Sequence, residues 1–238
     1  AKNIVRADNK VKGVSLAVRK GEILGIGGLV GAGRSETIGA IFGQYDKGVT
    51  KEVYIKGQKV EIHKPLDAIK NRIGLITEER KLSGIVPMLS IRENISLASL
   101  GKLSNGLFMN DAKVHCEAEK YKEQLATKTP TVKTLVRSLS GGNQQKVVIA
   151  KWLMRDCDIL IFDEPTKGID VGAKSEIYKL MNQLAAQGKS IIMISSEMPE
   201  LLRMSDRVVV MCEGRVTGEL DISEATQENI MTFATMRE

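Results

Sequence analysis

The sequence is poor in the residues that mark disulfide scaffolds, metal sites and membrane spans. It has only three cysteines, Cys116, Cys157 and Cys212, whose spacing fits neither a disulfide framework nor a zinc site. No apolar run approaches the roughly 18 residues of a membrane-spanning helix, and the first residues lack the apolar core of a signal peptide. We therefore expect a reduced, globular chain whose 238 residues suffice for one sizeable domain or a core with a subdomain.

Aromatic residues are also scarce, at 4% of the chain. The formal net charge of +6 is compatible with nucleic-acid binding. However, no block of five like charges occurs, and proteins that bind single strands combine basic grooves with aromatic stacking platforms. The composition therefore predicts that nucleic acid is not a partner.

What the chain does contain is a glycine-rich loop between a predicted strand at 22–26 and a predicted helix at 35–42. Gly28, Gly33 and Ser35 match the phosphate-loop pattern G-x-x-x-x-G-K-[ST], but Arg34 replaces the lysine. Backbone amides of such a loop and the helix N-terminus bind phosphates. The alternative is a strand-to-helix turn without a ligand. The predicted ATP-binding residues are Gly28, Leu29, Val30, Gly31, Ala32, Gly33, Arg34, Ser35 and Glu36.

Two adjacent carboxylates follow a second apolar strand, predicted at 159–162. Asp163 and Glu164 come directly after it, and α/β sheets place their ligands at the carboxyl ends of strands. Asp163 is suited to hold the water shell of Mg²⁺, with Ser35 as a second metal residue. Glu164 is suited as the catalytic residue that polarises an attacking water. The structural alternative is that both acids only cap the following turn.

A third motif, LSGGNQQK at 139–146, opens a predicted helix with a serine and two glycines. Its N-terminus presents a second set of backbone donors to an anion. Within one chain this site has no role. Across a dimer, Ser140, Gly141, Gly142 and Asn143 can meet the γ-phosphate that another subunit binds.

The remaining pattern predicts an α/β fold. Strands and helices alternate after residue 159, with a helix at 171–186, a strand at 191–194, a helix at 198–204 and a strand at 208–211. This alternation favours a mainly parallel sheet flanked by helices. Apolar segments at 53–55 and 60–62 predict a hairpin of an antiparallel side sheet. Strand signals vanish between 91 and 137, where helical spacing predominates.

Together the segments GLVGAGRSE, ITEERK, LSGGNQQK, DEPTKGIDVGAK and ISSEMPEL resemble the ATP-binding cassette (ABC) ATPases, from about Gly13 to Glu238. The sequence is most similar to the second, C-terminal cassette of the duplicated ATPase subunit in bacterial ribose, galactose and xylose importers. The resemblance implies one nucleotide-binding domain over 1–238, with a P-loop NTPase core and a helical subdomain inserted at about 85–155. It further implies that another cassette precedes Ala1 in a longer chain.

The same resemblance implies partners and a location. ATP with Mg²⁺ would lie between two cassettes arranged head to tail, the phosphate loop coming from one and the LSGG signature from the other. Membrane permease subunits would bind the cassette, with 80–100 as the docking surface, and a periplasmic or extracellular sugar-binding protein would act indirectly. The domain would then be a peripheral protein on the cytoplasmic face of the membrane.

Several positions depart from the family pattern, and all are expected on the side of the chain's own phosphate loop. Arg34 replaces the lysine, Glu78 stands where the family has glutamine, and Ser196 stands where a histidine normally contacts the γ-phosphate. No aromatic residue precedes the loop to stack on adenine, since the first is Phe42. The signature is intact except for Asn143, and Asp170 matches the loop that crosses between cassettes.

We therefore predict an ABC-type ATPase coupled to sugar import, whose own site hydrolyses ATP weakly while its signature completes the partner's site. The retained Glu164 leaves some capacity for hydrolysis. The alternative is a nucleotide-binding regulatory module without turnover. A cassette that acts on nucleic acid or ribosomes fits less well, because the interval between Ser35 and Ser140 leaves no room for a long coiled coil.

Overall fold

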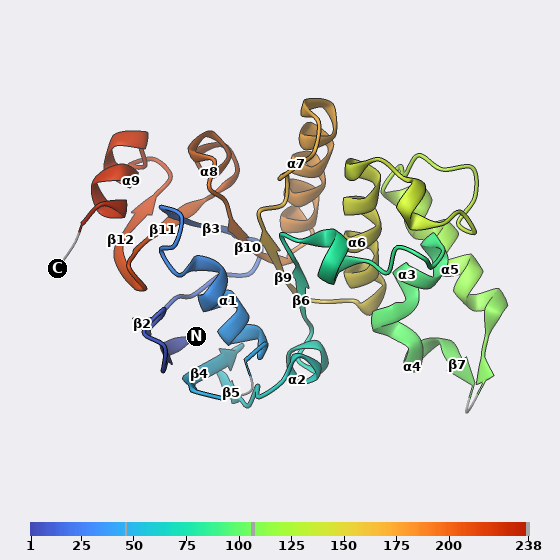
Figure 1. Cartoon of the computed structure of the whole chain (residues 1–238), viewed down its shortest axis with the longest axis horizontal. Helices are drawn as coiled ribbons and strands as arrows, with labels where there is room; N and C mark the ends of the chain where they lie inside the picture. Colours follow the sequence, from blue (N-terminus) through green and yellow to red (C-terminus); the bar gives the residue numbers. More distant parts are fainter. Residues whose placement is uncertain (46, 106–107, 237–238) are drawn as a thin grey trace. The chain divides into compact units, whose positions relative to one another are not determined.

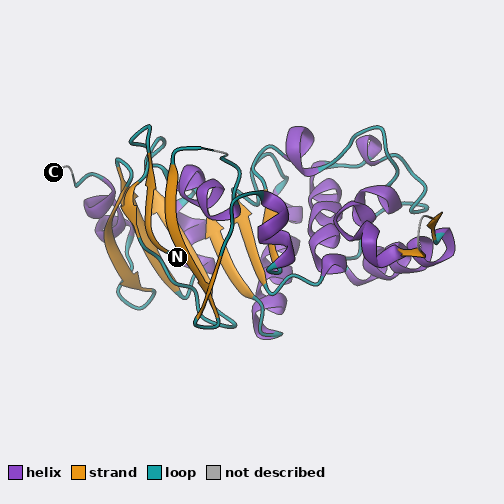
Figure 2. Cartoon of the chain, turned by 90° about the horizontal axis from the view of Figure 1, so that it is seen from below, coloured by secondary structure: helices purple, strands orange, loops and turns teal. Residues whose placement is uncertain are grey.

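A computed structural model describes residues 1–45, 47–105 and 108–236. The chain divides into two compact units. The first, here the core unit, comprises Ala1–Leu75, Asp158–Glu164 and Leu184–Glu238. The second, here the helical unit, comprises Ile76–Cys157 and Pro165–Gln183. Figure 2 shows that most of the strands belong to the core unit.

The core unit is organised around a six-stranded sheet of order β12-β11-β3-β10-β9-β6 (Figure 1). β11, β3, β10 and β9 are parallel, and β12 pairs antiparallel with β11. Their apolar residues are buried on both faces, as expected for parallel strands covered by helices. The strands are β3 (Ile23–Gly28), β6 (Ile73–Ile76), β9 (Ile159–Asp163), β10 (Ser190–Ile194), β11 (Arg207–Cys212) and β12 (Arg215–Asp221).

Helices cover both faces of this sheet. α8 (Met198–Met204) and α9 (Gln227–Ala234) pack on β3, and α9 also packs on β11. Ile230 and Ala234 of α9 are fully buried against Val208 and Val210. α1 (Arg34–Phe42) contacts β3 and also strands of the side sheet. α2 (Pro65–Lys70) is a short helix that precedes β6.

The side sheet is antiparallel and has the order β2-β1-β4-β5. Its strands are β1 (Lys2–Arg6), β2 (Lys12–Val14), β4 (Val49–Ile55) and β5 (Gln58–Val60). β4 and β5 form a hairpin whose turn is Lys56-Gly57, and both turn residues have positive φ. This backbone conformation matches the two-residue turns that hairpins favour.

The helical unit contains two long helices, α5 (Asp111–Gln124) and α6 (Gly141–Arg155), which contact each other. A capping box starts α3: the Ser90 N–H donates to Glu93 Oε2 at 2.7 Å. α7 (Val171–Ala186) belongs to this unit over most of its length. The shorter elements are η1 (Arg80–Gly84), α3 (Ile91–Ser96), η2 (Leu97–Ser99), α4 (Leu100–Leu103), β7 (Ser104–Asn105), β8 (Phe108–Met109) and η3 (Val136–Ser138).

The predicted fold class is confirmed: a mainly parallel sheet with flanking helices, an antiparallel side sheet and a largely helical second unit. One prediction is wrong, because β7 and β8 pair inside the stretch where no strand was expected. Two-residue strands are too short to leave an alternating pattern in the sequence. Among the described residues, no helix combines the length and apolar character needed to span a bilayer.

Candidate functional site

The glycine-rich loop joins the carboxyl end of β3 to α1 in the core unit. Gly33 is the N-cap of α1 with φ of 90°, and a Cβ there would lie 2.4 Å from the Lys10 carbonyl oxygen. Only glycine fits this conformation and close approach. Because Gly33 has no side chain, the first-turn amides of α1 receive no side-chain cap. They therefore remain suited to bind an anion.

The other loop residues differ in exposure. Gly28 ends β3, and Leu29, Val30 and Gly31 are exposed, Val30 to 93%. Ala32 is buried, and its N–H donates to the Leu29 carbonyl at 3.0 Å. Glu36, in the first turn of α1, pairs with Lys10 at 3.6 Å on the surface. Residues 29–31 of the loop are thus exposed between a buried strand and a mostly buried helix.

Arg34 points into the protein rather than out over the loop. It is 8% exposed, and its Nη1 donates to the Ser195 carbonyl at 2.6 Å. Its Nη2 lies 3.6 Å from Glu164 Oε1. Arg34 is one of the predicted ATP-binding residues, and that role stays a prediction. In the structure its guanidinium pairs with Glu164, the carboxylate predicted to be catalytic.

Glu164 is held from a second side as well. The Ser196 hydroxyl donates to Glu164 Oε2 at 3.1 Å, so each carboxylate oxygen has a partner. The backbone of Glu164 has φ of 49°, an uncommon value for a residue with a side chain. Its N–H donates to the Ile194 carbonyl at 3.0 Å, which ties it to β10. Arg34 and Ser196, two residues that depart from the family pattern, therefore meet on one carboxylate.

Ser35 and Asp163 lie together at the end of β9. The Ser35 hydroxyl donates to Asp163 Oδ1 at 3.0 Å. Mg²⁺ prefers hard oxygen ligands and is usually bound by one or two protein groups plus phosphate oxygens and water. Both side chains offer such oxygens next to the loop, so this donor set fits the ion. Ser35 and Asp163 could hold Mg²⁺ together with a bound phosphate.

The signature segment lies in the helical unit, where Ser140 is the N-cap of α6. Ser140 is exposed, and its Oγ accepts a hydrogen bond from Asn143 Nδ2 at 2.9 Å. Asn143 Oδ1 in turn accepts from the Lys128 N–H at 2.8 Å. A Cβ at Gly142 would lie 2.5 Å from the Ala173 Cβ, so α6 and α7 approach closely here. The glycine is required by packing.

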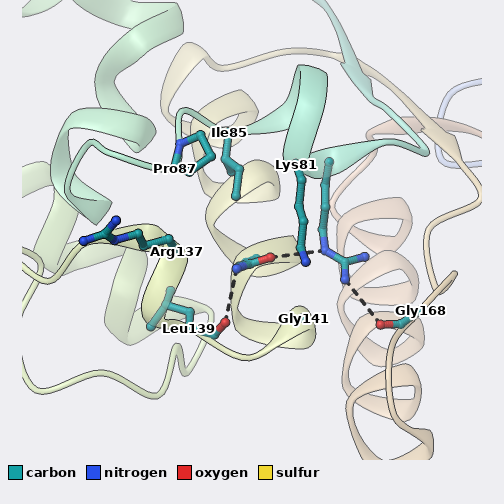
Figure 3. A pocket seen from close by; sticks show the side chains of 9 residues that line it. Lys81, Ile85, Pro87, Arg137, Leu139, Gly141 and Gly168 are labelled. Carbon is teal, nitrogen blue, oxygen red and sulfur yellow. Dashed lines mark hydrogen bonds between the residues drawn. The ribbon is translucent and has the colours of Figure 1, made fainter.

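A cavity of about 450 Å³ is lined in part by Leu139, Gly141 and Gln144 of the signature segment (Figure 3). At its wall, Arg80 donates to the carbonyls of Lys167 at 2.9 Å and Gly168 at 3.3 Å. Burial lowers the pKa of Arg80 from its ordinary value. Gln144 Nε2 donates to the Leu139 carbonyl at 3.2 Å, and its Oε1 faces Arg80 Nε at 3.5 Å. These contacts fix the signature's first turn against the segment before α7.

The remaining predicted residues also lie in the helical unit. Glu78 forms an ion pair with Lys167. Asp170 precedes α7, and its Oδ1 accepts a hydrogen bond from the Ala173 N–H at 2.9 Å, which caps the helix. Both side chains are thus engaged with neighbours in the same unit.

The structure brings one group of predicted residues together in the core unit: Arg34, Ser35, Asp163, Glu164 and Ser196. Glu78, Asp170 and 140–143 belong to the helical unit. A common nucleotide site for the two groups stays a prediction. Sequence reasoning missed the Ser195 carbonyl, for which a backbone atom leaves no signal. It placed Arg80 at the start of the predicted docking surface 80–100 but did not foresee its hydrogen bonds to the carbonyls of Lys167 and Gly168.

Comparison with known proteins supports the family. The model of the family "ABC transporter" matches residues 11–167. "Putative ribose/galactose/methyl galactoside import ATP-binding protein 1" of Burkholderia lata is 54% identical over 229 residues, covering 96% of this chain and 44% of that protein. "Xylose import ATP-binding protein XylG" of Thermoanaerobacter pseudethanolicus is 52% identical over 241 residues, covering 98% and 48%. The chain therefore spans less than half of each relative's length.

Solved structures agree on the fold. A nucleotide-free ATP-binding cassette from an ABC transporter superposes with a TM-score of 0.81 at 23% identity, covering 97% of this chain and 93% of that one. The cassette MJ0796, in a dimeric post-hydrolysis state bound to ADP and Pi, gives a TM-score of 0.77 at 24% identity, covering 93% and 97%. With the loop, the paired carboxylates and the signature in place, the chain belongs to the ATP-binding cassette family of ABC transporters.

Proposed function

We propose that this chain is an ATP-binding and ATP-hydrolysing cassette that energises import of a monosaccharide. In this proposal its own phosphate loop binds ATP but turns it over slowly, while Ser140 to Asn143 complete the site of a partner cassette. The sugar class is supported by the names of relatives that are 54% and 52% identical, which are ribose, galactose and xylose import proteins.

The observation that carries the slow-turnover proposal is the double capture of Glu164. Its two carboxylate oxygens face Arg34 at 3.6 Å and Ser196 at 3.1 Å. A carboxylate that orients a water must be within hydrogen-bond reach of that water. Its two oxygens offer about four acceptor positions, and Arg34 and Ser196 occupy two of them and fix the orientation of Glu164. A reorientation of Glu164 toward a water weakens its charge pair with Arg34, and this cost adds to the barrier.

The remaining residues of the site are suited to nucleotide binding. Backbone amides of the loop and the N-terminus of α1 would hold the phosphates. Ser35 and Asp163 would hold Mg²⁺, which would neutralise charge that develops during phosphoryl transfer. Phosphoryl transfer depends almost entirely on positioning and charge stabilisation. Because Arg34 and Glu164 face each other, we expect their pairing to slow ATP hydrolysis more than it weakens ATP binding.

The proposed partners follow from the chain's partial length and its exposed signature. The chain covers 44% of the Burkholderia relative, which leaves room in such a protein for a second cassette. We place that cassette head to tail with this one. Permease subunits would dock on 80–100, where Leu82 and Met88 are exposed to 82% and 63%. The assembly would sit on the cytoplasmic face of the membrane and receive sugar from an external binding protein.

The division of labour is tested by uptake of ribose, galactose and xylose into vesicles that contain the full-length protein and its permease. Ser140→Arg fills the exposed N-cap of α6 and should lower uptake about a hundredfold, the order lost when a donor to a phosphoryl or oxyanion group is removed. Glu164→Gln should lower it only severalfold. Ser138→Ala, at an exposed serine two residues away, is the matched control. Equal loss from Ser140→Arg and Glu164→Gln would contradict the proposal.

The second candidate is a regulatory module that binds nucleotide without turnover, and the capture of both Glu164 oxygens favours it. Arg34→Lys distinguishes the two, because lysine carries a point charge without the planar fork that reaches both Ser195 and Glu164. Phosphate release that rises in Arg34→Lys and disappears in Arg34→Lys/Glu164→Gln supports a slow ATPase. Release that is absent from both variants supports the binding module.

A further inference from the structure

A second cavity, of about 810 Å³, lies in the core unit away from the phosphate loop. It is lined by Ile159 and Ser190, the first residues of β9 and β10, whereas Asp163 stands at the other end of β9. Four residue steps along a strand correspond to about 13 Å. The cavity therefore lies at the opposite end of the sheet from the candidate nucleotide site.

The walls of this cavity are aliphatic. The side sheet contributes Val53, which is buried, and the segment before β3 contributes Leu16 and Val18. These aliphatic side chains offer no hydrogen-bond partners, so polar groups of a ligand that lie against them would lose their water without compensation. The walls suit a hydrocarbon chain, which gains free energy with each buried methylene. The isoleucines that line the cavity are Ile41, Ile55, Ile73, Ile159, Ile161 and Ile192.

The polar lining of the cavity is cationic. Lys2, Lys20 and Lys56 line it together with a single acid, Asp158. Asp158 accepts a hydrogen bond from Arg72 at 2.8 Å and also pairs with Lys56 at 3.5 Å, and this hydrogen bond from Arg72 is the main cause of its lowered pKa. Its charge is thus already compensated. Within the described part of the chain, Lys20 has neither a hydrogen bond nor an ion pair.

We propose that this cavity binds an amphipathic carboxylate of the fatty-acid class, with its chain against the isoleucines and its carboxylate at Lys20 and Lys2. The volume of about 810 Å³ lies in the range of small-molecule sites. The excess of lysines disfavours a cationic amphiphile, and the aliphatic walls favour a ligand with a hydrocarbon chain over one that is polar throughout. This site is independent of ATP and of the transported sugar.

The first test uses the full-length protein with ¹³C-labelled isoleucine δ1-methyl groups and decanoate as the probe. Decanoate should shift the methyl signals of the six lining isoleucines saturably, and other isoleucines should not move. Decyltrimethylammonium, which has the same chain and the opposite charge, should not bind there. Shifts at isoleucines outside the cavity, or equal binding of the cation, would overturn the proposal.

Variants sharpen the test. Lys20→Glu should weaken decanoate binding about tenfold, the effect expected for loss of one charge-assisted contact. Val53→Trp fills the cavity and should abolish binding, whereas Leu66→Trp, an exposed residue on α2, should leave it intact. If Val53→Trp does not fold, the half-buried Ile55→Trp blocks the same cavity from β4. Unchanged decanoate binding in a folded Trp variant of the cavity and in Lys20→Glu would refute the site.

Discussion

The phosphate-loop region of the core unit and the signature region of the helical unit are both built on helix N-termini, but they use their side chains differently. In the first, Arg34 is buried and paired with Glu164, and Ser196 takes the second carboxylate oxygen. In the second, Ser140 is exposed and its hydroxyl accepts a hydrogen bond from Asn143. The first region satisfies its charges internally, whereas the second presents its helix N-terminus to the outside.

This difference affects ATP hydrolysis at the phosphate loop and anion binding at the signature in different ways. An ion pair such as Arg34–Glu164 fixes the orientation of both side chains, and turning either of them toward a ligand weakens a charge pair with little exposure to water. The Ser140 side chain makes no hydrogen bond to the first-turn amides of α6, so an anion that binds these amides displaces no side-chain cap. The N-terminus of α6 is therefore the more accessible of the two helix N-termini, as the proposed role of the signature requires.

The largest expected effect tests the ion pair itself. Arg34→Ala leaves the Glu164 carboxylate buried without its cation and should lower the free energy of unfolding by about 3–5 kcal/mol. Adding Glu164→Gln should recover part of that loss, because the unpaired charge is removed. Chemical denaturation measures both. Lys10→Ala breaks the exposed Lys10–Glu36 pair and serves as the control, with an expected cost of about 0–1 kcal/mol. Similar losses for both alanine variants would contradict the comparison.

The next effect concerns packing in the signature region. Gly142→Ala places a methyl group 2.5 Å from the Ala173 Cβ and should destabilise the protein by about 1–3 kcal/mol. Gly101→Ala, in α4, is the matched control, because nothing lies within 4 Å of a Cβ there. It should be neutral or stabilising by up to about 1 kcal/mol. A denaturation midpoint for Gly142→Ala that equals the Gly101→Ala value would refute the close α6–α7 contact.

A pH titration probes the same helix from its other end. Lys151 in α6 donates to the Gly84 carbonyl at 2.7 Å, and burial lowers its pKa from 10.5 to about 8. Between these values the unfolded chain binds more protons than the folded one, so this lysine makes stability rise with pH there. Lys151 contributes at most about 1.4 kcal/mol per pH unit to the change of the unfolding free energy with pH. Lys151→Met should reduce the slope measured by denaturation between pH 8 and 10.5. An unchanged slope would mean that the ammonium is well solvated.

The smallest expected effect concerns the second contact to Glu164. Ser196→Ala removes the hydroxyl that donates at 3.1 Å and should cost about 0.5–1.5 kcal/mol. A double-mutant cycle with Glu164→Gln isolates the coupling between the two side chains. Coupling indistinguishable from zero would leave Arg34 as the only partner that matters for Glu164.

The sequence predicted the elements that carry the site because those signals are local. Helices at 171–186 and 198–204 were expected from apolar spacing and are found with those bounds. The strand before Asp163 and the helix after Ser140 follow equally short-range patterns of apolar residues, serine and glycine. The β7–β8 hairpin escaped prediction because each strand has only two residues, too few for an alternating pattern.

The orientation of Arg34 was decided by contacts far away in the sequence. Its partner carbonyl at Ser195 lies 161 residues along the chain, and the register of β3, β10 and β9 brings the two together. The hydrogen bonds from Arg80 to the carbonyls of Lys167 and Gly168 likewise join residues that are 87 and 88 positions apart in the sequence. No window of neighbouring residues contains that information.

By itself the sequence determined that this protein has a phosphate-loop motif, a pair of carboxylates at a strand end and an LSGG segment, and its resemblance to known cassettes implied the ABC fold. Residue type and spacing suffice for the local features, because backbone turns, helix starts and buried strands depend on neighbouring residues. Only the tertiary structure decided that Arg34 faces Glu164 and that an aliphatic cavity opens at the far end of the sheet. A long side chain such as that of Arg34 can reach several partners, and burial and strand register in the folded chain determine which of them it contacts.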